Sequence, residues 1–163
     1  MIRELLSEKH LRRKFRCEHE ALNIYLRAHA LRNDRENLSR THVVVEGAGD
    51  TRILGYMTLA NGAVSPEVIP GSGPPSYSRG TLILARLARD LDFRGTGVGP
   101  FLMAEALSLA VRHAEEAGIY AVEVLAKDEK AQAFYRQYGF QPLIDDQLHM
   151  YLPLAAVPDG FRD

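Results

Sequence analysis

Residues 81–126 carry the pattern that most restricts how this chain can fold. Thr81–Arg89 is almost continuously apolar, which suits a central strand covered on both faces. Glycines at 95, 97 and 99 follow, and apolar residues then recur at helical spacing from Phe101 to Ala117, before Gly118. Residues 120–126 alternate between apolar and polar, as a strand does. A strand, a turn, a helix and a further strand in succession predict an α/β protein.

The flanking segments add further strands and helices around one sheet. We expect a helix at 18–32, strands at 41–46 and 52–60 joined as an antiparallel hairpin, a long Gly/Pro-rich loop at 62–80, a helix that begins after Asp128 and ends at Gly139, and a last strand at 147–154 in which Pro153 marks an edge or an end. The predicted fold class is α/β, an α+β sandwich with a mixed sheet flanked by helices. A length of 163 residues fits a single domain, 1–163.

Composition narrows the class of protein. With 46% hydrophobic residues the chain can bury a core without a metal or a disulfide, and one cysteine cannot form an internal disulfide, which fits the cytoplasm. Its apolar runs fall well short of the ~20 residues that cross a bilayer. Disorder, a membrane span, a membrane partner and a secreted disulfide scaffold are therefore not expected.

Charge is distributed unevenly along the chain. The net charge is −1, but residues 1–40 hold ten Lys/Arg and six Asp/Glu, and residues 121–163 hold four and seven. The basic end has two interpretations: a footprint for phosphates, or a solvated helical surface diluted by glutamates. The basic residues concerned are Lys9, Arg12, Arg13, Lys14, Arg16, Arg27, Arg32, Arg35 and Arg40.

The glycine-rich turn, residues 94–100, is the clearest candidate for a ligand site. Glycines let a ligand approach the backbone, and a helix N-terminus adds unpaired N–H donors and a partial positive charge. A pyrophosphate suits such a turn, with Arg94 as a bidentate partner. The glycines match neither the Walker phosphate loop nor the dinucleotide fingerprint. A tight strand–helix turn without a ligand is the alternative interpretation.

Two motifs in this order resemble the GNAT family of N-acetyltransferases. Arg94-x-x-Gly97-x-Gly99 is similar to the family's coenzyme A pyrophosphate motif, and residues 128–140 resemble its later helix, which passes the cofactor thiol and ends in a Gly-Phe turn. The resemblance covers residues 15–154 and implies the GNAT fold, splayed at the cofactor site, with acetyl-CoA as co-substrate and no metal. The residues it assigns to the cofactor are Leu87, Ala88, Arg89, Arg94, Gly95, Thr96, Gly97, Val98, Gly99, Pro100, Asp128 and Phe134.

Shorter stretches resemble one group within that family, the acetyltransferase toxins of type II toxin–antitoxin pairs. They are Phe15-x-Cys17, Ser39-Arg40-Thr41, Gly55-Tyr56, Leu84–Ala88 and Leu148–Leu154. This resemblance implies acetylation of the α-amine of aminoacyl-tRNA and neutralisation by a ribbon–helix–helix antitoxin.

Three positions depart from that pattern. Leu125 stands where His or Asp is expected, Arg89 where a small apolar residue is usual, and Pro100 where a basic residue often follows the glycines. Pro100 removes one N–H donor and one positive charge from the phosphate site.

Tyr135 is the predicted catalytic residue, because it matches the family tyrosine that approaches the sulfur. A phenol with an ordinary pKa of about 10 suits proton donation to a thiolate with a pKa of about 8.5. The other interpretation of Tyr135 is an aromatic side chain packed beside Phe134 and Tyr138 at helical spacing.

No general base stands out in the sequence. We expect His42 and His149 to be strand residues, His113 to pack on its helix, and Asp145-Asp146 to form a turn. Cys17 is interpreted as a buried structural thiol, and no Cys/His spacing supports zinc. A missing base favours an α-amine, which titrates near 7.7–8, over a lysine amine near 10.4.

Three functions stay open at this point. The first is acetylation of aminoacyl-tRNA, with the basic residues of 9–40, Arg79 and Arg86 holding phosphates. The second is acetylation of a small-molecule amine or a protein N-terminus, with loop 62–80 shaping the acceptor pocket. The third is a non-catalytic acyl-CoA-binding module. A homodimer is compatible with the last strand and the exposed loop.

Overall fold

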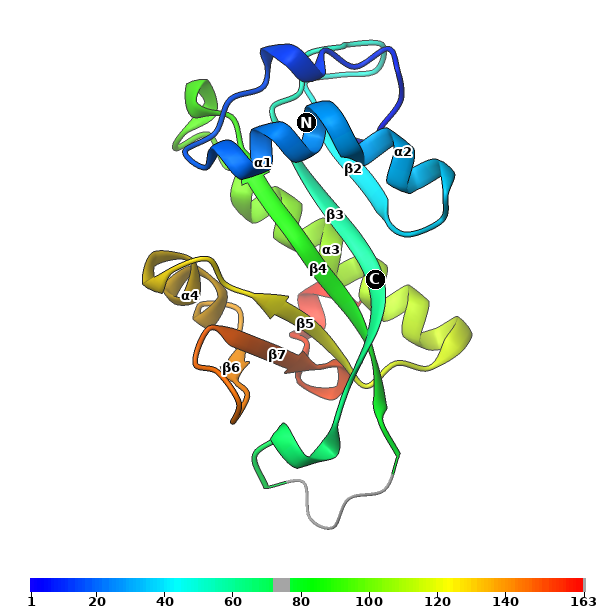
Figure 1. The fold of residues 1–163 in the computed structure, drawn as a ribbon, viewed down its shortest axis with the longest axis vertical. Helices are drawn as coiled ribbons and strands as arrows, with labels where there is room; N and C mark the ends of the chain where they lie inside the picture. The colour runs from blue at the N-terminus through cyan, green and yellow to red at the C-terminus, as the bar shows by residue number, and fades with distance from the viewer. Residues whose placement is uncertain (72–76, 163) are drawn as a thin grey trace. The chain divides into compact units, whose positions relative to one another are not determined.

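The computed structural model describes residues 1–71 and 77–162, and Figure 1 shows the order of its elements. The strands are β1 (Ile2–Leu5), β2 (Arg40–Val45), β3 (Gly55–Val64), β4 (Arg79–Arg89), β5 (Ala121–Leu125), β6 (Gln141–Pro142) and β7 (His149–Pro153). The helices are α1 (Glu20–Ile24), α2 (Ala30–Arg35), α3 (Val98–Ala117) and α4 (Glu129–Arg136). The strand order is β1-β2-β3-β4-β5-β7-β6, with parallel and antiparallel neighbours, which confirms the mixed sheet of the predicted α/β fold.

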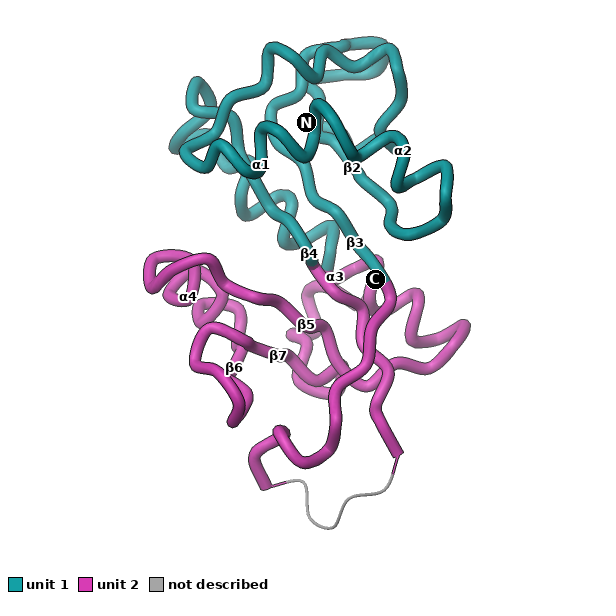
Figure 2. The backbone as a smooth tube through the Cα atoms, in the orientation of Figure 1, with its two compact units in different colours: residues 1–60, 85–106 teal, residues 61–84, 107–163 magenta. Residues whose placement is uncertain are grey.

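The chain divides into two compact units, shown in Figure 2. Unit 1 comprises residues 1–60 and 85–106, and unit 2 comprises residues 61–84 and 107–163. Three elements, β3, β4 and α3, begin in one unit and end in the other. The single domain expected from chain length stays a prediction.

Unit 1 is built on three antiparallel strands. Ile2 of β1 lies opposite Val45 of β2, and Thr41 of β2 lies opposite Thr58 of β3, so the predicted hairpin is confirmed. Its core gathers aromatic and aliphatic side chains from the strands and from the helical segment at 20–35. The largest members are Leu6, Phe15, Leu22, Tyr25, Leu26, Ile53 and Tyr56.

The helical segment of unit 1 contains a π turn. Tyr25–His29 lies between α1 and α2, so the predicted helix 18–32 exists but runs from Glu20 to Arg35 and is widened in its middle. A π turn closes i→i+5 hydrogen bonds and holds one residue more than an α turn. Apolar periodicity cannot reveal it, because the spacing on either side still fits a helix.

Unit 2 contains the only parallel strand pair of the described registers. β4 and β5 run parallel from Thr81 opposite Ala121, and β5 and β7 run antiparallel. β7 also pairs with β6 through Met150 and Tyr151, and Pro153 ends the strand, which confirms the expectation of an edge or an end there. The core of this unit gathers Val64, Ile69, Ala121, Leu143 and Tyr151.

Two strands and part of a third were absent from the sequence prediction. β1 contains Arg3 and Glu4, which are half-buried in ionic contacts and so hide any apolar alternation. β6 has only two residues. β3 continues to Val64, so the loop predicted at 62–80 shortens to 65–78, and its residues 72–76 lie outside the described residues. Gly62 belongs to the strand because a Cβ there would collide with Ile83.

Candidate active site

Asp90 fixes the end of β4 in unit 1. Its side chain is 3% exposed and accepts hydrogen bonds from the backbone N–H groups of Arg16 (3.0 Å) and Asp92 (2.9 Å). The backbone adds a bond from Leu91 N–H to the carbonyl of Arg16 (2.8 Å). Asp90 therefore orients the short 3₁₀ turn at 91–93 that leads into the glycine turn. The sequence prediction missed it, although an Asp directly after an apolar strand is a capping signal.

The glycine turn itself adopts a backbone that suits glycine. Gly95 and Gly97 have φ angles of 72° and 89°, in the left-handed region that side chains disfavour. Thr96 closes the turn on the carbonyl of Phe93, through its hydroxyl at 2.6 Å and its N–H at 3.3 Å. Residues 94–97 are exposed, so the turn is accessible to a ligand.

Helix α3 begins directly at this turn, at Val98, ahead of the helical spacing of apolar residues that starts at Phe101. Val98 is buried at 1% exposure and anchors the helix start, and the N–H of Phe101 donates to the carbonyl of Gly97 (3.0 Å). The N–H groups of Val98 and Gly99 precede the first intrahelical partner, and Pro100 has none to offer. A 20-residue helix thus points two backbone donors and its positive end at the exposed turn.

The remaining cofactor candidates of unit 1 lie on β4 and beside the turn. Leu87 is half-buried, and Ala88 belongs to the core, so Ala88 can contact a ligand only through its backbone. Arg89 pairs with Glu18 through one Nη (2.8 Å), and its Nε is buried without a hydrogen-bond partner. Arg94 is exposed and uses its Nε on the carbonyl of Leu91 (3.2 Å), which leaves its terminal nitrogens toward solvent.

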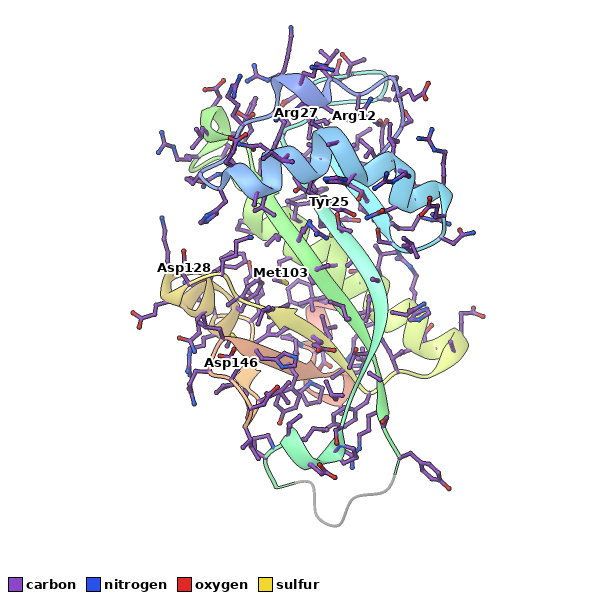
Figure 3. The ribbon with its side chains drawn as sticks, viewed as in Figure 1. Arg12, Tyr25, Arg27, Met103, Asp128 and Asp146 are labelled. Carbon is purple, nitrogen blue, oxygen red and sulfur yellow. The ribbon has the colours of Figure 1, made fainter. Side chains whose placement is uncertain are left out.

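The other predicted residues lie on α4 in unit 2. Asp128, labelled in Figure 3, caps the helix by accepting from the N–H of Ala131 (2.8 Å), as predicted. Phe134 and Tyr135 follow in the last turn, with ring centroids 5.5 Å apart. Gly139, at a φ of 95°, ends the segment. Leu125, the departure at the end of β5, is 67% exposed.

Tyr135 combines a buried ring with a reachable hydroxyl. The residue is 7% exposed, and its ring also lies 5.6 Å from that of Phe140. Burial raises the pKa of the phenol to about 12. Its hydroxyl has no hydrogen bond with residues 1–71 or 77–162 and is not among their buried unpartnered atoms. The ring therefore packs, as one interpretation of the sequence expected, whereas a proton-donating role of the hydroxyl stays a prediction.

His42, His113 and His149 lie in the strands and the helix expected from the sequence. His42 is buried in β2, and burial, reinforced by the charge of Arg3, lowers its pKa to about 4. His113 is half-buried on α3. His149 lies between Glu123 (2.5 Å) and Asp145 (3.0 Å).

The pKa of His149 is raised overall: its burial alone would lower it, but the hydrogen bonds to Asp145 and Glu123 raise it. Asp145 is thus an ion-pair partner of His149 as well as a turn residue, whereas Asp146 does cap its turn on Leu148 N–H (2.9 Å). Cys17 is buried, and its thiol donates a hydrogen bond to the carbonyl of His19. Residues 1–71 and 77–162 contain no cluster of three potential metal ligands.

The basic residues of unit 1 fall into two sets. Most are neutralised or bonded locally: Lys9 by Glu4, Arg27 by Glu20, Arg35 by Glu8, Arg12 by the carbonyl of Arg27, and Arg40 by Asn37 and the carbonyl of Asp34. Four others are exposed and make no ion pair within the described residues, namely Arg13, Lys14, Arg16 and Arg32. The phosphate footprint, one of the two interpretations of the basic end, is therefore left with these four free cations and stays a prediction. No described helix is long and apolar enough to span a membrane.

Comparison with known proteins identifies the family. The profile of the acetyltransferase (GNAT) domain matches residues 39–142. A tRNA-acetylating toxin of Mycobacterium tuberculosis is 33% identical over 134 residues, 81% of this chain and 79% of the relative.

Two solved structures of AtaT are similar along nearly the whole chain. AtaT complexed with acetyl-methionyl-tRNAfMet has a TM-score of 0.87 at 27% identity and covers 94% of this chain and 95% of its own. A mutant AtaT toxin bound to the C-terminus of the antitoxin AtaR and acetyl-CoA has a TM-score of 0.85 at 26% identity, with coverage of 99% and 98%.

Proposed function

The chain belongs to the GNAT acetyltransferase family, and from this premise we propose that it transfers the acetyl group of acetyl-CoA to the α-amine of aminoacyl-tRNA. The observation that supports this substrate most is the likeness to AtaT with acetyl-methionyl-tRNAfMet over 94% of the chain. The free cations of unit 1 are compatible with a large polyanion, and they support RNA over a small amine.

We propose that acetyl-CoA is held through the residues named from the sequence. The amides of Val98 and Gly99 and the guanidinium of Arg94 bind the pyrophosphate, because left-handed Gly95 and Gly97 open the turn to a phosphate. The backbone of Leu87, Ala88 and Arg89 binds the pantetheine arm and the acetyl carbonyl. Asp128 and Phe134, which belong to unit 2, are the remaining residues proposed to contact acetyl-CoA.

The reaction needs a neutral amine and a donor for the departing sulfur. The amine nitrogen attacks the thioester carbonyl carbon, the C–S bond breaks, and the ammonium proton of the intermediate leaves to water. An α-amine titrates near 7.7–8, so a substantial fraction is neutral at pH 7 without a protein base. This agrees with the hydrogen bonds of two histidines, which already have partners in the protein. His42 is bonded to Arg3, and His149 is bonded to the carboxylates of Glu123 and Asp145.

Tyr135 is the proposed hydrogen-bond donor to the sulfur, and the burial of its ring determines how it can act. With a pKa of about 12 the phenol stays protonated at neutral pH, but it is a weaker acid than the ordinary phenol expected from sequence. A coenzyme thiolate, at about 8.5, is the weaker base of the two. The hydroxyl therefore stabilises the developing thiolate by hydrogen bonding, and the thiolate takes its final proton from solvent.

The proposal extends to a partner and a place in the cell. AtaT has been seen with the C-terminus of its antitoxin, so we propose a ribbon–helix–helix antitoxin as the protein partner of this chain. The substrate places the enzyme in the cytoplasm, where aminoacyl-tRNA is made. A homodimer stays an expectation from sequence.

The experiment offers the purified chain acetyl-CoA with a panel of aminoacyl-tRNAs and reads acetylated aminoacyl-tRNA by mass spectrometry. Deacylated tRNA is the negative control, and free amino acids and peptides are the competing acceptors. We expect acetylated aminoacyl-tRNA with wild type and far less with Tyr135→Phe. A higher kcat/KM on free amines or peptides would move the assignment to a small-molecule or N-terminal acetyltransferase. Binding of coenzyme A without turnover of any amine would instead indicate a non-catalytic acyl-CoA-binding module.

A further inference from the structure

Arg86, on the part of β4 that belongs to unit 1, is a half-buried cation without an anion. Its guanidinium lies 3.5 Å from the ring centroid of Tyr25, and it makes no ion pair and no hydrogen bond with residues 1–71 or 77–162. Arg3 and Arg89, which are similarly half-buried, are each bonded to a carboxylate. Removing a cation from water without a partner is unfavourable, so the isolation of Arg86 needs an explanation.

The ring beneath Arg86 is held rigidly. Tyr25, labelled in Figure 3, opens the π turn and is 5% exposed. Its hydroxyl lies 3.2 Å from the hydroxyl of Ser39 and accepts a hydrogen bond from the Asn33 amide, also at 3.2 Å. Two polar partners thus fix the phenol, and the fixed ring restricts the guanidinium stacked on it. Such pre-ordering lowers the entropy lost when the guanidinium binds a ligand.

Stacking on Tyr25 leaves the N–H donors of the Arg86 guanidinium unoccupied. The ring covers a face of the guanidinium, whereas its five N–H donors lie in the plane of the group. None of its nitrogens is among the buried unpartnered atoms, so they are accessible. Planar paired donors match the oxygens of a phosphate better than any neutral group. The free cations Arg13, Lys14, Arg16 and Arg32 belong to the same unit.

We propose that Arg86, positioned by Tyr25, binds one backbone phosphate of the RNA substrate. The inference rests on the proposed function and names a contact within it. The phosphates of acetyl-CoA are the other source of the same chemistry. The RNA source is favoured because the turn at 95–99 supplies backbone donors of its own to the coenzyme, and because the free cations suit a long polyanion.

The test measures binding of deacylated tRNA as a function of salt. Each phosphate neutralised contributes about 0.7 to 0.9 to the slope of log Kd against log salt. Arg86→Met is expected to lower that slope by about one contact and to weaken binding roughly tenfold at moderate salt. Arg86→Lys keeps the charge but not the planar fork, so it is expected to keep the slope and lose part of the affinity.

Two further variants separate the stack from general effects of charge. Arg52→Met is the matched control, because Arg52 also stacks on a ring, that of Phe93 at 4.8 Å, but is already paired with Asp92 at 2.7 Å. It is expected to leave the slope unchanged. Tyr25→Phe keeps the ring and removes its two hydroxyl contacts, so it is expected to weaken tRNA binding less than Arg86→Met does, with the slope retained.

Coenzyme A binding by Arg86→Met distinguishes the two phosphate sources and also reports folding. We expect wild-type affinity for coenzyme A. A tenfold loss of coenzyme affinity with unchanged tRNA binding would overturn the RNA assignment. An unchanged salt slope in Arg86→Met, with a wild type that acetylates aminoacyl-tRNA, would overturn this contact and leave the proposed function standing. A wild type that binds no tRNA would overturn both.

Discussion

The two units differ in charge in the way that their proposed tasks require. Unit 1 contains 14 Lys/Arg and 11 Asp/Glu, a net charge of +3, whereas unit 2 contains 6 and 10, a net charge of −4. The glycine turn, Arg94 and the stacked Arg86 belong to the positive unit, and Tyr135 belongs to the negative one. The comparison teaches that a near-neutral chain can divide its charge between a basic and an acidic unit, which net charge alone conceals.

The histidines repeat this contrast at the scale of single side chains. His42 in unit 1 accepts from Arg3 at 2.9 Å, which requires a neutral ring nitrogen. His149 in unit 2 has a carboxylate on each ring nitrogen, and these hydrogen bonds favour the doubly protonated ring and raise its pKa. The same residue type is therefore shifted toward the neutral form in the basic unit and toward the charged form in the acidic one.

The largest expected effect separates the chemistry of unit 2 from the binding of unit 1. Tyr135→Phe removes the hydrogen-bond donor to the departing sulfur, so kcat is expected to fall about 10² to 10³-fold, in the range of one hydrogen-bond donor to a developing anion. The Kd of acetyl-CoA is expected to stay near wild type. Rapid-quench kinetics and calorimetry measure the two quantities, and an unchanged kcat would remove Tyr135 from the mechanism.

The second effect compares a buried and an exposed acid that both accept backbone N–H groups. Asp90→Ala leaves two amides without a partner inside unit 1, and we expect a loss of about 2 to 3 kcal/mol in the free energy of unfolding. Asp146→Ala in unit 2 exposes its amide to water and is expected to cost less than about 1 kcal/mol. Urea unfolding compares the variants. Equal losses would mean that burial does not govern this difference.

The third effect is an opposite pH dependence of the two histidines. The folded pKa of His42 is about 4, below the unfolded value near 6.5, so its contribution is present above pH 6.5 and is lost as pH falls toward 4. Allowing for partial solvent screening, that loss is about 2 kcal/mol. The pKa of His149 is raised, so its contribution is present at low pH and is lost as pH rises through the folded pKa.

Unfolding free energies of wild type, His42→Gln and His149→Gln between pH 5 and 8 test both signs. His42→Gln is expected to reduce the loss of stability at acid pH, and His149→Gln to reduce the loss at alkaline pH. The contrast between the units would be refuted if both substitutions changed the pH dependence in the same direction.

The smallest effect concerns the glycine turn. Gly97→Ala has space for its methyl group, with only the Met1 side chain within 4 Å, but it forces alanine to a φ of 89°. Such a residue costs about 1 to 2 kcal/mol, which is expected to raise the KM of acetyl-CoA roughly tenfold with little change in kcat. Gly160→Ala, which meets no atom within 4 Å and has no unusual φ, is the control. A fall in kcat alone would contradict a purely binding role.

Local signals explain which parts of the fold could be predicted. The cap at Asp128, the left-handed glycines at 118 and 139, and the apolar run of β4 each depend on neighbouring residues, and all were predicted within a few positions. β1 escaped prediction because its central residues are charged, and one of them, Arg3, pairs with Glu105, about a hundred residues away.

The residues of the candidate site likewise divide into those with a local sequence signal and those whose partners are distant in sequence. The glycine turn and Tyr135 were found from motifs, and their roles in cofactor binding and catalysis stay predictions. Asp90 and the stack of Arg86 on Tyr25 were not found, because their partners are distant in sequence: Arg16 is 74 residues from Asp90. The raised pKa of Tyr135 likewise follows from burial, which spacing along a helix does not quantify.

Because β3, β4 and α3 are each divided between the units, a single cut in the gene cannot separate one unit from the other. Neither unit is encoded by one contiguous stretch, since the chain changes unit after residues 60, 84 and 106. A stop codon at 107 would leave every residue of unit 1 but only residues 61–84 of unit 2, and it would remove Tyr135. A split enzyme divided there is therefore expected to be silent until both fragments are supplied, which makes this junction suitable for a complementation assay.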